Sequence, residues 1–283
     1  MNTYIYKFLL KICPDVLRMY LRGVKLPLEI EIHLAEHCNL NCVSCLHYSP
    51  IAKPAYPDIR RLEKNLAELS KVQKWFHTVR LLGGEPLLNP DISQILNITR
   101  EHMNKARIEL VTNGILLQSH KLPSDFWETC RKNDIIIAIS KYPIGLDYDK
   151  IKKICETNNC IFQIFGDRIG NDGFCAYKLE PLTYKKNFLK YICCSNRRCL
   201  QLVDDQIFPC SVSAYVNHIN DKFGYNFRHK KNDAIKIEDI NLLKLLWFMS
   251  YAKPFCAYCT PRSPSFPWRQ SKLESSEWIN IDR

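Results

Sequence analysis

The stretch LEIEIHLAEHCNLNCVSC, residues 28–45, decides the fold. In its first part, residues 28–34, apolar and polar side chains alternate with the two-residue period of a half-buried β-strand. The part that follows places Cys38, Cys42 and Cys45 in the loop after this strand. A strand that ends in a cysteine-rich loop indicates a sheet that carries a metal or redox site at its strand ends.

Strands and helices then alternate along the chain. This alternation predicts right-handed crossovers and a parallel sheet, with ligands at the carboxyl ends of the strands. We expect an α/β fold, a partial (β/α)6 barrel left open, because about five such units precede residue 166. The expected strands are residues 28–34, 78–82, 107–112, 135–140 and 160–165, and the expected helices are 61–75, 91–103, 124–132 and 148–157.

Three segments are predicted from the change of pattern along the chain. Residues 1–27 form a helical lead-in, residues 28–185 form the barrel, and residues 186–283 form a small domain with a tail. The small domain contains a hairpin at residues 199–210 and a helix near residues 237–251. The charges of the lead-in are sparse and mixed, so packing on the barrel is favoured over a role at a membrane surface. No apolar run is long enough to span a bilayer.

Composition restricts the partners and the compartment. The formal net charge of +11 favours anionic partners, but no nucleic-acid-binding motif accompanies it. Fourteen cysteines without a secretory signal indicate a reducing cytoplasm, where clustered cysteines are metal ligands or redox groups. Cysteines that stand singly are expected to be small buried hydrophobes; these are Cys13, Cys130, Cys155, Cys160 and Cys175.

The three cysteines of the first loop can bind three irons of one cubane cluster. The fourth iron then has no protein ligand and can bind and transform a small molecule. A zinc site on the same residues would be short of one ligand, which His37 or His47 would supply. Both alternatives stay open at this point.

The C-x3-C-x2-C spacing, on a loop after the first strand of a β/α domain, resembles the radical S-adenosylmethionine superfamily. This resemblance implies a [4Fe–4S] cluster on Cys38, Cys42 and Cys45, with S-adenosylmethionine chelated to the open iron. An electron from a donor such as flavodoxin or ferredoxin then breaks the sulfonium bond. The resulting 5′-deoxyadenosyl radical abstracts a hydrogen atom from the substrate. Many relatives carry an aromatic residue just before the third cysteine, where this chain has Ser44.

A second motif follows the second predicted strand. Gly83, Gly84, Glu85 and Pro86 resemble the glycine-rich GGEP motif of the same family. Glycines let the backbone approach a ligand closely, and strand-end carbonyls together with Glu85 offer acceptors for the methionyl ammonium group. The alternative interpretation is a simple turn.

Two weaker matches lie at the ends of the next strands. The segment Val-Thr-Asn-Gly at residues 111–114 resembles the strand-end TNG of the family, and it contains Asn113. Ser140 ends the following strand, where relatives often place a polar group that contacts the ribose or the carboxylate. Each of these residues could equally be a turn or cap residue. No general base is named, because several Asp, Glu, Lys and Tyr residues are candidates.

The C-terminal cysteines form a third group. A C-x2-C pair that follows a distant pair of cysteines is typical of a metal site. The segment resembles the twitch domain, the short relative of the SPASM extension, which binds an auxiliary iron–sulfur cluster. Cys193 or Cys194 could replace one ligand, and a structural zinc is the alternative metal. The preferred ligands are Cys199, Cys210, Cys256 and Cys259.

The state of the auxiliary site determines whether the reaction is an oxidation or an epimerisation. A fully ligated cluster takes an electron from a substrate radical, which gives oxidation, whereas a free Cys193 or Cys194 thiol returns a hydrogen atom, which gives epimerisation. We expect a carbohydrate-like small molecule, phosphorylated or nucleotide-linked, as the substrate. The second hypothesis is maturation of a ribosomally made peptide, and the third is a zinc-binding scaffold without catalysis. The basic residues that suit a phosphate, or else form a solvated face, are Lys185, Lys186, Lys190, Arg197, Arg198, Arg262, Arg269 and Lys272.

Overall fold

This computed structural model describes most of the chain. The predicted lead-in at residues 1–27 and the segment boundary at residue 185 lie outside the described residues, so the division into three segments stays a prediction. The described residues are 28–119, 121–169, 173–181, 191, 194–197 and 199–280.

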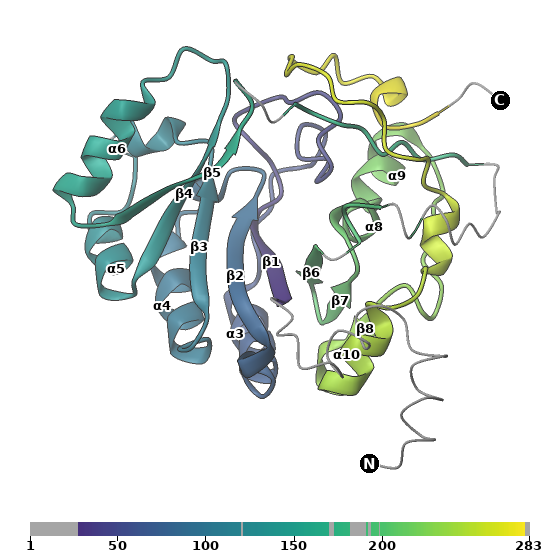
Figure 1. The fold of residues 1–283 in the computed structure, drawn as a ribbon, viewed down its shortest axis with the longest axis horizontal. Coiled ribbons are helices and arrows are strands. Elements are labelled where there is room, and N and C mark those ends of the chain that lie inside the picture. Colours follow the sequence, from purple (N-terminus) through teal and green to yellow (C-terminus); the bar gives the residue numbers. More distant parts are fainter. Residues whose placement is uncertain are drawn as a thin grey trace, which may run out of the picture.

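Five parallel strands, β1 to β5, lie side by side in the order of the sequence, as the alternation predicts. Helices alternate with these strands (Figure 1). The α/β class and the parallel sheet are therefore confirmed. The strands are β1 (Leu28–Ala35), β2 (Phe76–Gly83), β3 (Arg107–Thr112), β4 (Ile135–Lys141) and β5 (Ile161–Asp167), and the helices are α3 (Ile59–Ser70), α4 (Ile92–His102), α5 (Phe126–Lys132) and α6 (Tyr148–Thr157).

The sheet continues on the other side of β1 with three strands from the C-terminal half. β6 (Leu200–Val203) pairs with β1 in parallel, and β7 (Gln206–Phe208) and β8 (Ile235–Lys236) follow in antiparallel. The turn between β6 and β7 contains Asp204 with a φ of 50°, a left-handed conformation that Asp tolerates well. The predicted hairpin is confirmed, and it extends the same sheet instead of forming a separate one.

In the described part of the C-terminal half there are three α-helices. They are α8 (Ser211–Ala214), α9 (Asn217–Phe223) and α10 (Leu242–Phe248). The helix predicted over residues 237–251 is shorter, because the Asn241 side chain accepts a hydrogen bond from the Lys244 N–H at 2.9 Å and caps α10 there. Within the described part of the chain, no helix combines the length and apolarity that crossing a bilayer requires.

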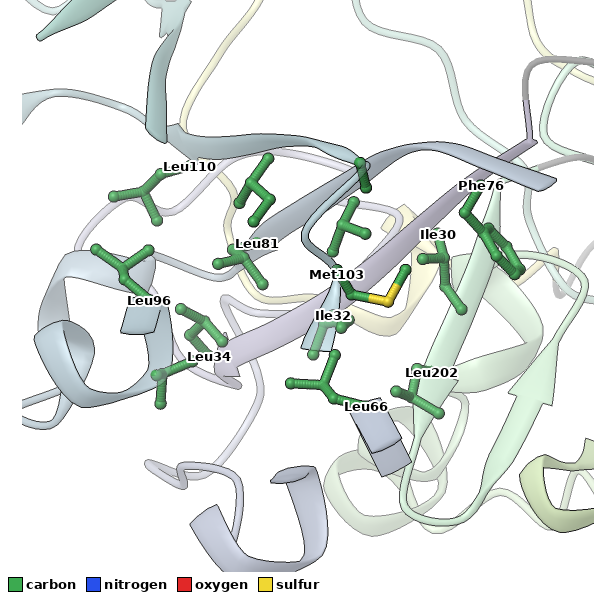
Figure 2. Close-up of a cluster of buried hydrophobic side chains, with 14 of the residues drawn as sticks. Ile30, Ile32, Leu34, Leu66, Phe76, Leu81, Leu96, Met103, Leu110 and Leu202 are labelled. Carbon is green, nitrogen blue, oxygen red and sulfur yellow. The ribbon is translucent and has the colours of Figure 1, made fainter. Parts of the chain in front are cut away.

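The main core lies between the strands and the helices. Ile30, Ile32 and Leu34 point from one face of β1 toward Leu66 of α3 and Leu96 of α4 (Figure 2). Each side chain is completely or almost completely buried, and burying one such side chain stabilises the fold by about 2 kcal/mol. The alternation in residues 28–34 places this apolar row on the helix side.

The other face of the sheet is polar. Arg80 donates to Glu109 at 2.9 Å and also pairs with Glu29. The Glu31 carboxylate accepts a hydrogen bond from Gln201 at 2.5 Å. The alternation of apolar and polar residues in β1 therefore buries the isoleucines on the helix side and places paired charges on the opposite face of the sheet. This polar face leads up to the ends of the strands.

Candidate active site

The three cysteines of the loop after β1 line one cavity at the carboxyl ends of the parallel strands. Its volume is about 230 Å³. Four other predicted site residues line the same cavity, so one loop and three strand ends converge on it. These four residues are Gly83, Gly84, Asn113 and Ser140.

The two glycines let the end of β2 pack against the cysteine loop. A Cβ on Gly84 would lie 2.0 Å from the carbonyl oxygen of His37. A Cβ on Gly83 would lie 2.3 Å from the carbonyl oxygen of Ala35. The Gly84 N–H donates to Ala35 at 2.8 Å, and the Glu85 N–H donates to His37 at 3.1 Å. The close approach that only glycine allows is therefore made by Gly83 to the end of β1 and by Gly84 to the cysteine loop.

Glu85 is completely buried and joins the ends of β2 and β3. Its carboxylate accepts hydrogen bonds from the Thr112 hydroxyl at 2.6 Å, the Asn113 N–H at 3.0 Å and the Leu87 N–H at 3.1 Å. Burial raises the pKa of Glu85 to about 7, although these three bonds oppose the shift. Glu85 and Pro86, which begins the short helix η2 (Pro86–Leu88), do not line the cavity. A direct contact of Glu85 with a ligand stays a prediction.

Asn113 links the end of β3 to the cysteine loop. Its side-chain nitrogen donates to the side-chain oxygen of Asn39 at 2.7 Å, and lies 4.0 Å from the sulfur of Cys38. Its side-chain oxygen accepts from the Ile115 N–H at 3.0 Å, which forms a turn. Asn113 is therefore a turn residue that also lines the cavity, and its contact with a cofactor stays a prediction.

Hydrogen-bond donors point at the cysteine sulfur atoms. The Leu40 N–H lies 3.3 Å from the Cys38 sulfur, and the Trp268 indole N–H lies 3.1 Å from the Cys42 sulfur. The backbone N–H of His47 hydrogen-bonds to the sulfur of Cys45. Thiolates bound to iron carry negative charge that such donors stabilise. The three cysteines and their donors therefore fit an iron–sulfur cluster.

The cysteines are protonated thiols when no metal is bound. Burial raises the pKa of Cys42 to about 12, and burial also raises the pKa values of Cys38 and Cys45. A buried thiol of this kind is a poor nucleophile at neutral pH. A bound cation reverses the balance, because a thiol that coordinates a metal loses its proton. The site therefore suits metal binding better than nucleophilic catalysis.

Several residues of the cavity wall were not predicted. Tyr142 follows Ser140 at the end of β4, and Arg168 follows β5. Phe174 and Cys175 come from a later segment, although Cys175 was expected to be a structural cysteine. The strand-end rule that identified Ser140 also points to Tyr142 and Arg168. No signal in the sequence joins residues 174 and 175 to this cavity.

The two histidines considered as zinc ligands have different surroundings. His47 lines the cavity, but its Nδ1 lies 2.7 Å from Nε2 of His33, and burial lowers its pKa to about 3. His37 lies outside the cavity wall, with its ring 5.4 Å from that of Tyr56. Among the described residues, no three His, Cys, Asp or Glu side chains converge closely enough for a single metal ion. A cubane cluster is wider than one ion, so its ligands stand farther apart.

A second cavity collects cysteines from the C-terminal half. Its volume is about 300 Å³, and Cys194, Cys210, Cys256 and Cys259 all line it. Cys199, the fourth ligand preferred from the sequence, is not in this wall. The Cys194 thiol, which the sequence left as an alternative, occupies that place. None of the described cysteines forms a disulfide bond.

Cys199 lies on the polar side of the sheet instead. It directly precedes β6, and its thiol interacts electrostatically with Glu31 and Arg80. Burial raises the pKa of Cys199 to about 12. Cys199 and Cys210, which were predicted to bind one metal site, therefore lie at different places: Cys199 at the polar face of the sheet and Cys210 in the second cavity.

The predicted basic residues that the structure describes do not line the first cavity. Arg197 and Arg262 line the second cavity. Arg269 and Lys272 are exposed in the tail, and Arg168 is the one described arginine or lysine that lines the first cavity. The remaining four, Lys185, Lys186, Lys190 and Arg198, lie outside the described residues.

The fold and the site define an α/β protein with a thiol-lined pocket at the carboxyl edge of a parallel sheet. Residues 32–155, which carry both strand-end motifs, match the family model of the Radical SAM superfamily. This part of the chain is therefore similar to a radical SAM domain. Enzymes of the superfamily use a [4Fe–4S] cluster and S-adenosylmethionine.

Curated relatives match a limited part of the chain. Mycofactocin maturase MftC of Mycobacterium tuberculosis (strain ATCC 25618 / H37Rv) is 28% identical over 102 residues, which are 36% of this chain and 25% of the relative. GTP 3',8-cyclase of Peptoclostridium acidaminophilum is 30% identical over 92 residues, 32% of this chain and 28% of the relative. The chain thus matches about a quarter of the length of these relatives.

Solved structures give partial superpositions. BtrN in complex with AdoMet and 2-DOIA aligns with a TM-score of 0.43 and 16% identity, covering 83% of this chain and 93% of that chain. Native anSMEcpe with bound AdoMet aligns with a TM-score of 0.38 and 20% identity, covering 49% of this chain and 44% of that chain.

Proposed function

We propose that this chain holds a [4Fe–4S] cluster through Cys38, Cys42 and Cys45 and cleaves S-adenosylmethionine reductively. A cluster held there would supply the electron for this cleavage, and the resulting radical chemistry would abstract hydrogen from a carbohydrate-like or nucleotide-sugar substrate. A flavodoxin or ferredoxin supplies the electron. The proposed compartment is the reducing cytoplasm, where thiolates stay available for iron.

One observation carries this proposal. Three thiols from a single loop share a cavity with the glycines of a GGEP motif at the ends of parallel strands. The protein's own contribution is to bind and orient. The Glu85 N–H and the Asn113 side chain fix the cysteine loop to the ends of β2 and β3, and N–H groups stabilise the charge on the sulfurs.

We propose that the second cavity holds an auxiliary iron–sulfur cluster on Cys194, Cys210, Cys256 and Cys259. Four thiols around one cavity support this ligand set over the set with Cys199. A cluster with four protein ligands has no free iron for substrate and therefore serves as an electron acceptor. The product of this arrangement is an oxidised substrate.

Epimerisation is the second outcome, and one observation favours it. Cys175 lines the first cavity and has a thiol that can return a hydrogen atom to a substrate radical. Turnover in D2O separates the two outcomes: a deuterium atom in the product that is lost in Cys175→Ser supports epimerisation. An oxidised product without deuterium supports dehydrogenation.

Maturation of a ribosomally made peptide is the alternative function. It is supported by the match to a maturase over 102 residues. Incubation with a panel of nucleotide sugars and with a candidate precursor peptide from a neighbouring gene distinguishes the two. The substrate that accelerates formation of 5′-deoxyadenosine identifies the class.

The primary test is anaerobic reconstitution followed by iron and sulfide analysis. We expect two cubane clusters per chain and 5′-deoxyadenosine after reduction with dithionite. Cys42→Ala should abolish that product and remove one cluster. Cys194→Ser should remove the other, whereas Cys199→Ser should keep both. A protein that binds zinc and no iron would refute the proposal and support the scaffold.

A further inference from the structure

The segment 266–280 returns over the cysteine loop and hydrogen-bonds to its backbone. The Val43 N–H donates to the carbonyl of Arg269 at 3.1 Å, and the Ser271 N–H donates to the carbonyl of Asn41 at 2.8 Å. These bonds form an antiparallel bridge around Cys42. Figure 1 shows this yellow segment at the same end of the molecule as the purple loop that follows β1.

Trp268 is the residue of this segment that reaches a sulfur atom. Its indole N–H lies 3.1 Å from the sulfur of Cys42. The ring is half-buried and stands edge-on to Tyr142 with 6.2 Å between ring centres, and Tyr142 itself lines the cavity. An indole nitrogen is only ever a donor, so the direction of this hydrogen bond is fixed.

A second part of the segment holds the rest of the loop. The Ser44 hydroxyl donates to the carbonyl of Glu277 at 3.0 Å, and the Trp278 indole N–H donates to the carbonyl of Cys45 at 3.0 Å. The Glu277 carboxylate in turn accepts from the Ser271 hydroxyl at 2.6 Å. Ser44, the residue before the third cysteine, thus binds the segment 266–280 to the loop. This attachment holds Trp268 against the loop.

We propose that Trp268 is a positioning residue that raises the reduction potential of the cluster on Cys42. An added electron increases the negative charge on the ligating sulfur, so an N–H donor to that sulfur stabilises the reduced state more than the oxidised state. This inference rests on the proposed function, because it requires Cys42 to be a cluster ligand.

The size of the effect follows from the strength of the bond. A hydrogen bond to a charged acceptor is about twice as strong as one between neutral groups, and part of this strength is gained only on reduction. We expect about a tenfold change in the equilibrium constant for reduction. For a one-electron couple, tenfold is about 59 mV.

The test is an anaerobic redox titration of the full chain, followed by electron paramagnetic resonance. The open-iron cluster is identified by the change of its signal when S-adenosylmethionine is added. Trp268→Phe keeps an aromatic ring and removes the N–H, so we expect a potential about 59 mV more negative at unchanged iron content. Trp278→Phe is the matched control. It removes an indole bond to a carbonyl of the same loop, and its potential should stay at the wild-type value.

An unchanged or more positive potential in Trp268→Phe overturns the inference, as does an equal shift in both variants. Wild-type protein labelled with nitrogen-15 in its indole groups provides a measurement without substitution. The reduced cluster should couple to one such nitrogen, and absence of the coupling overturns the inference. A wild-type chain without iron refutes the proposed function itself, which is a distinct outcome.

Discussion

Replacement of Gly84 by alanine tests whether this glycine serves the cysteine loop. The added Cβ would lie 2.0 Å from the His37 carbonyl oxygen, 2.3 Å from its carbon and 2.8 Å from the Cys38 nitrogen. All three atoms belong to the backbone, so no side-chain rotation relieves the contact. The loop must therefore move away from β2.

The cost can be worked out from two contributions. Overpacking costs about 1–3 kcal/mol, and movement of the loop breaks the hydrogen bonds of Gly84 to Ala35 and of Glu85 to His37. Each such bond contributes about 1 kcal/mol. We expect a loss of about 3–5 kcal/mol in the free energy of unfolding, which corresponds to a decrease of about 6–20 °C in Tm for a chain of this size.

Urea denaturation of the metal-free protein measures this loss without the contribution of a cluster. Gly166→Ala is the matched control, because Gly166 also lies near the end of a parallel strand and its nearest neighbours are Arg168 side-chain atoms at 3.6 Å. We expect the control to change stability by less than about 0.5 kcal/mol. If Gly84→Ala is as stable as the control and binds iron normally, the close approach is not a requirement of the loop.

Three further predictions concern buried polar groups. Arg80→Met removes an ion pair of Glu109 inside the sheet, so urea denaturation should show a loss of about 3 kcal/mol; an unaltered midpoint would contradict this. Burial raises the pKa of Glu85 from 4.5 to about 7, so the folded state binds this proton more tightly than the unfolded state. The contribution of Glu85 to stability is therefore lost as the pH rises through this window, by about 3 kcal/mol, and Glu85→Gln should abolish that slope. Ser44 has a φ of 51° and is 5% exposed, so Ser44→Phe should release the segment 266–280 and speed its cleavage by trypsin; equal cleavage rates would argue against this.

Much of the fold could be predicted because strand and helix periods are local properties. The strand predicted at residues 107–112 and the helix predicted at residues 148–157 have the observed bounds. The neighbour of β1 on its outer side could not be predicted, because pairing of β1 with β6 joins residues far apart in sequence. The helix over residues 237–251 was predicted too long, since its apolar pattern continues past the Asn241 cap.

The site likewise contains residues that the local sequence predicts and residues that only long-range packing brings in. The shared cavity of Cys38, Cys42 and Cys45 could be predicted because all three belong to one loop. The place of Ser140 in the cavity wall could be predicted because Ser140 lies near the end of β4. Trp268 could not be found, because its approach to Cys42 depends on a segment that returns over the loop.

The local sequence likewise could not show whether Cys194 or Cys199 lines the second cavity. The two residues are close in sequence, yet β6 begins directly after Cys199 and directs its thiol toward the polar face. The cavity with the other C-terminal cysteines is lined by Cys194. The spacing of cysteines in the sequence does not show which thiol points into the cavity and which one points to the polar face of the sheet.

The pairing of β1 with β6 has a consequence for electron flow. The first cysteine loop follows β1, and Cys210 follows the hairpin that begins with β6. Backbone hydrogen bonds between these strands fix the distance between the two thiol sites. Electron tunnelling slows steeply with distance, so this strand pair sets the rate at which two metal centres at these sites could exchange an electron.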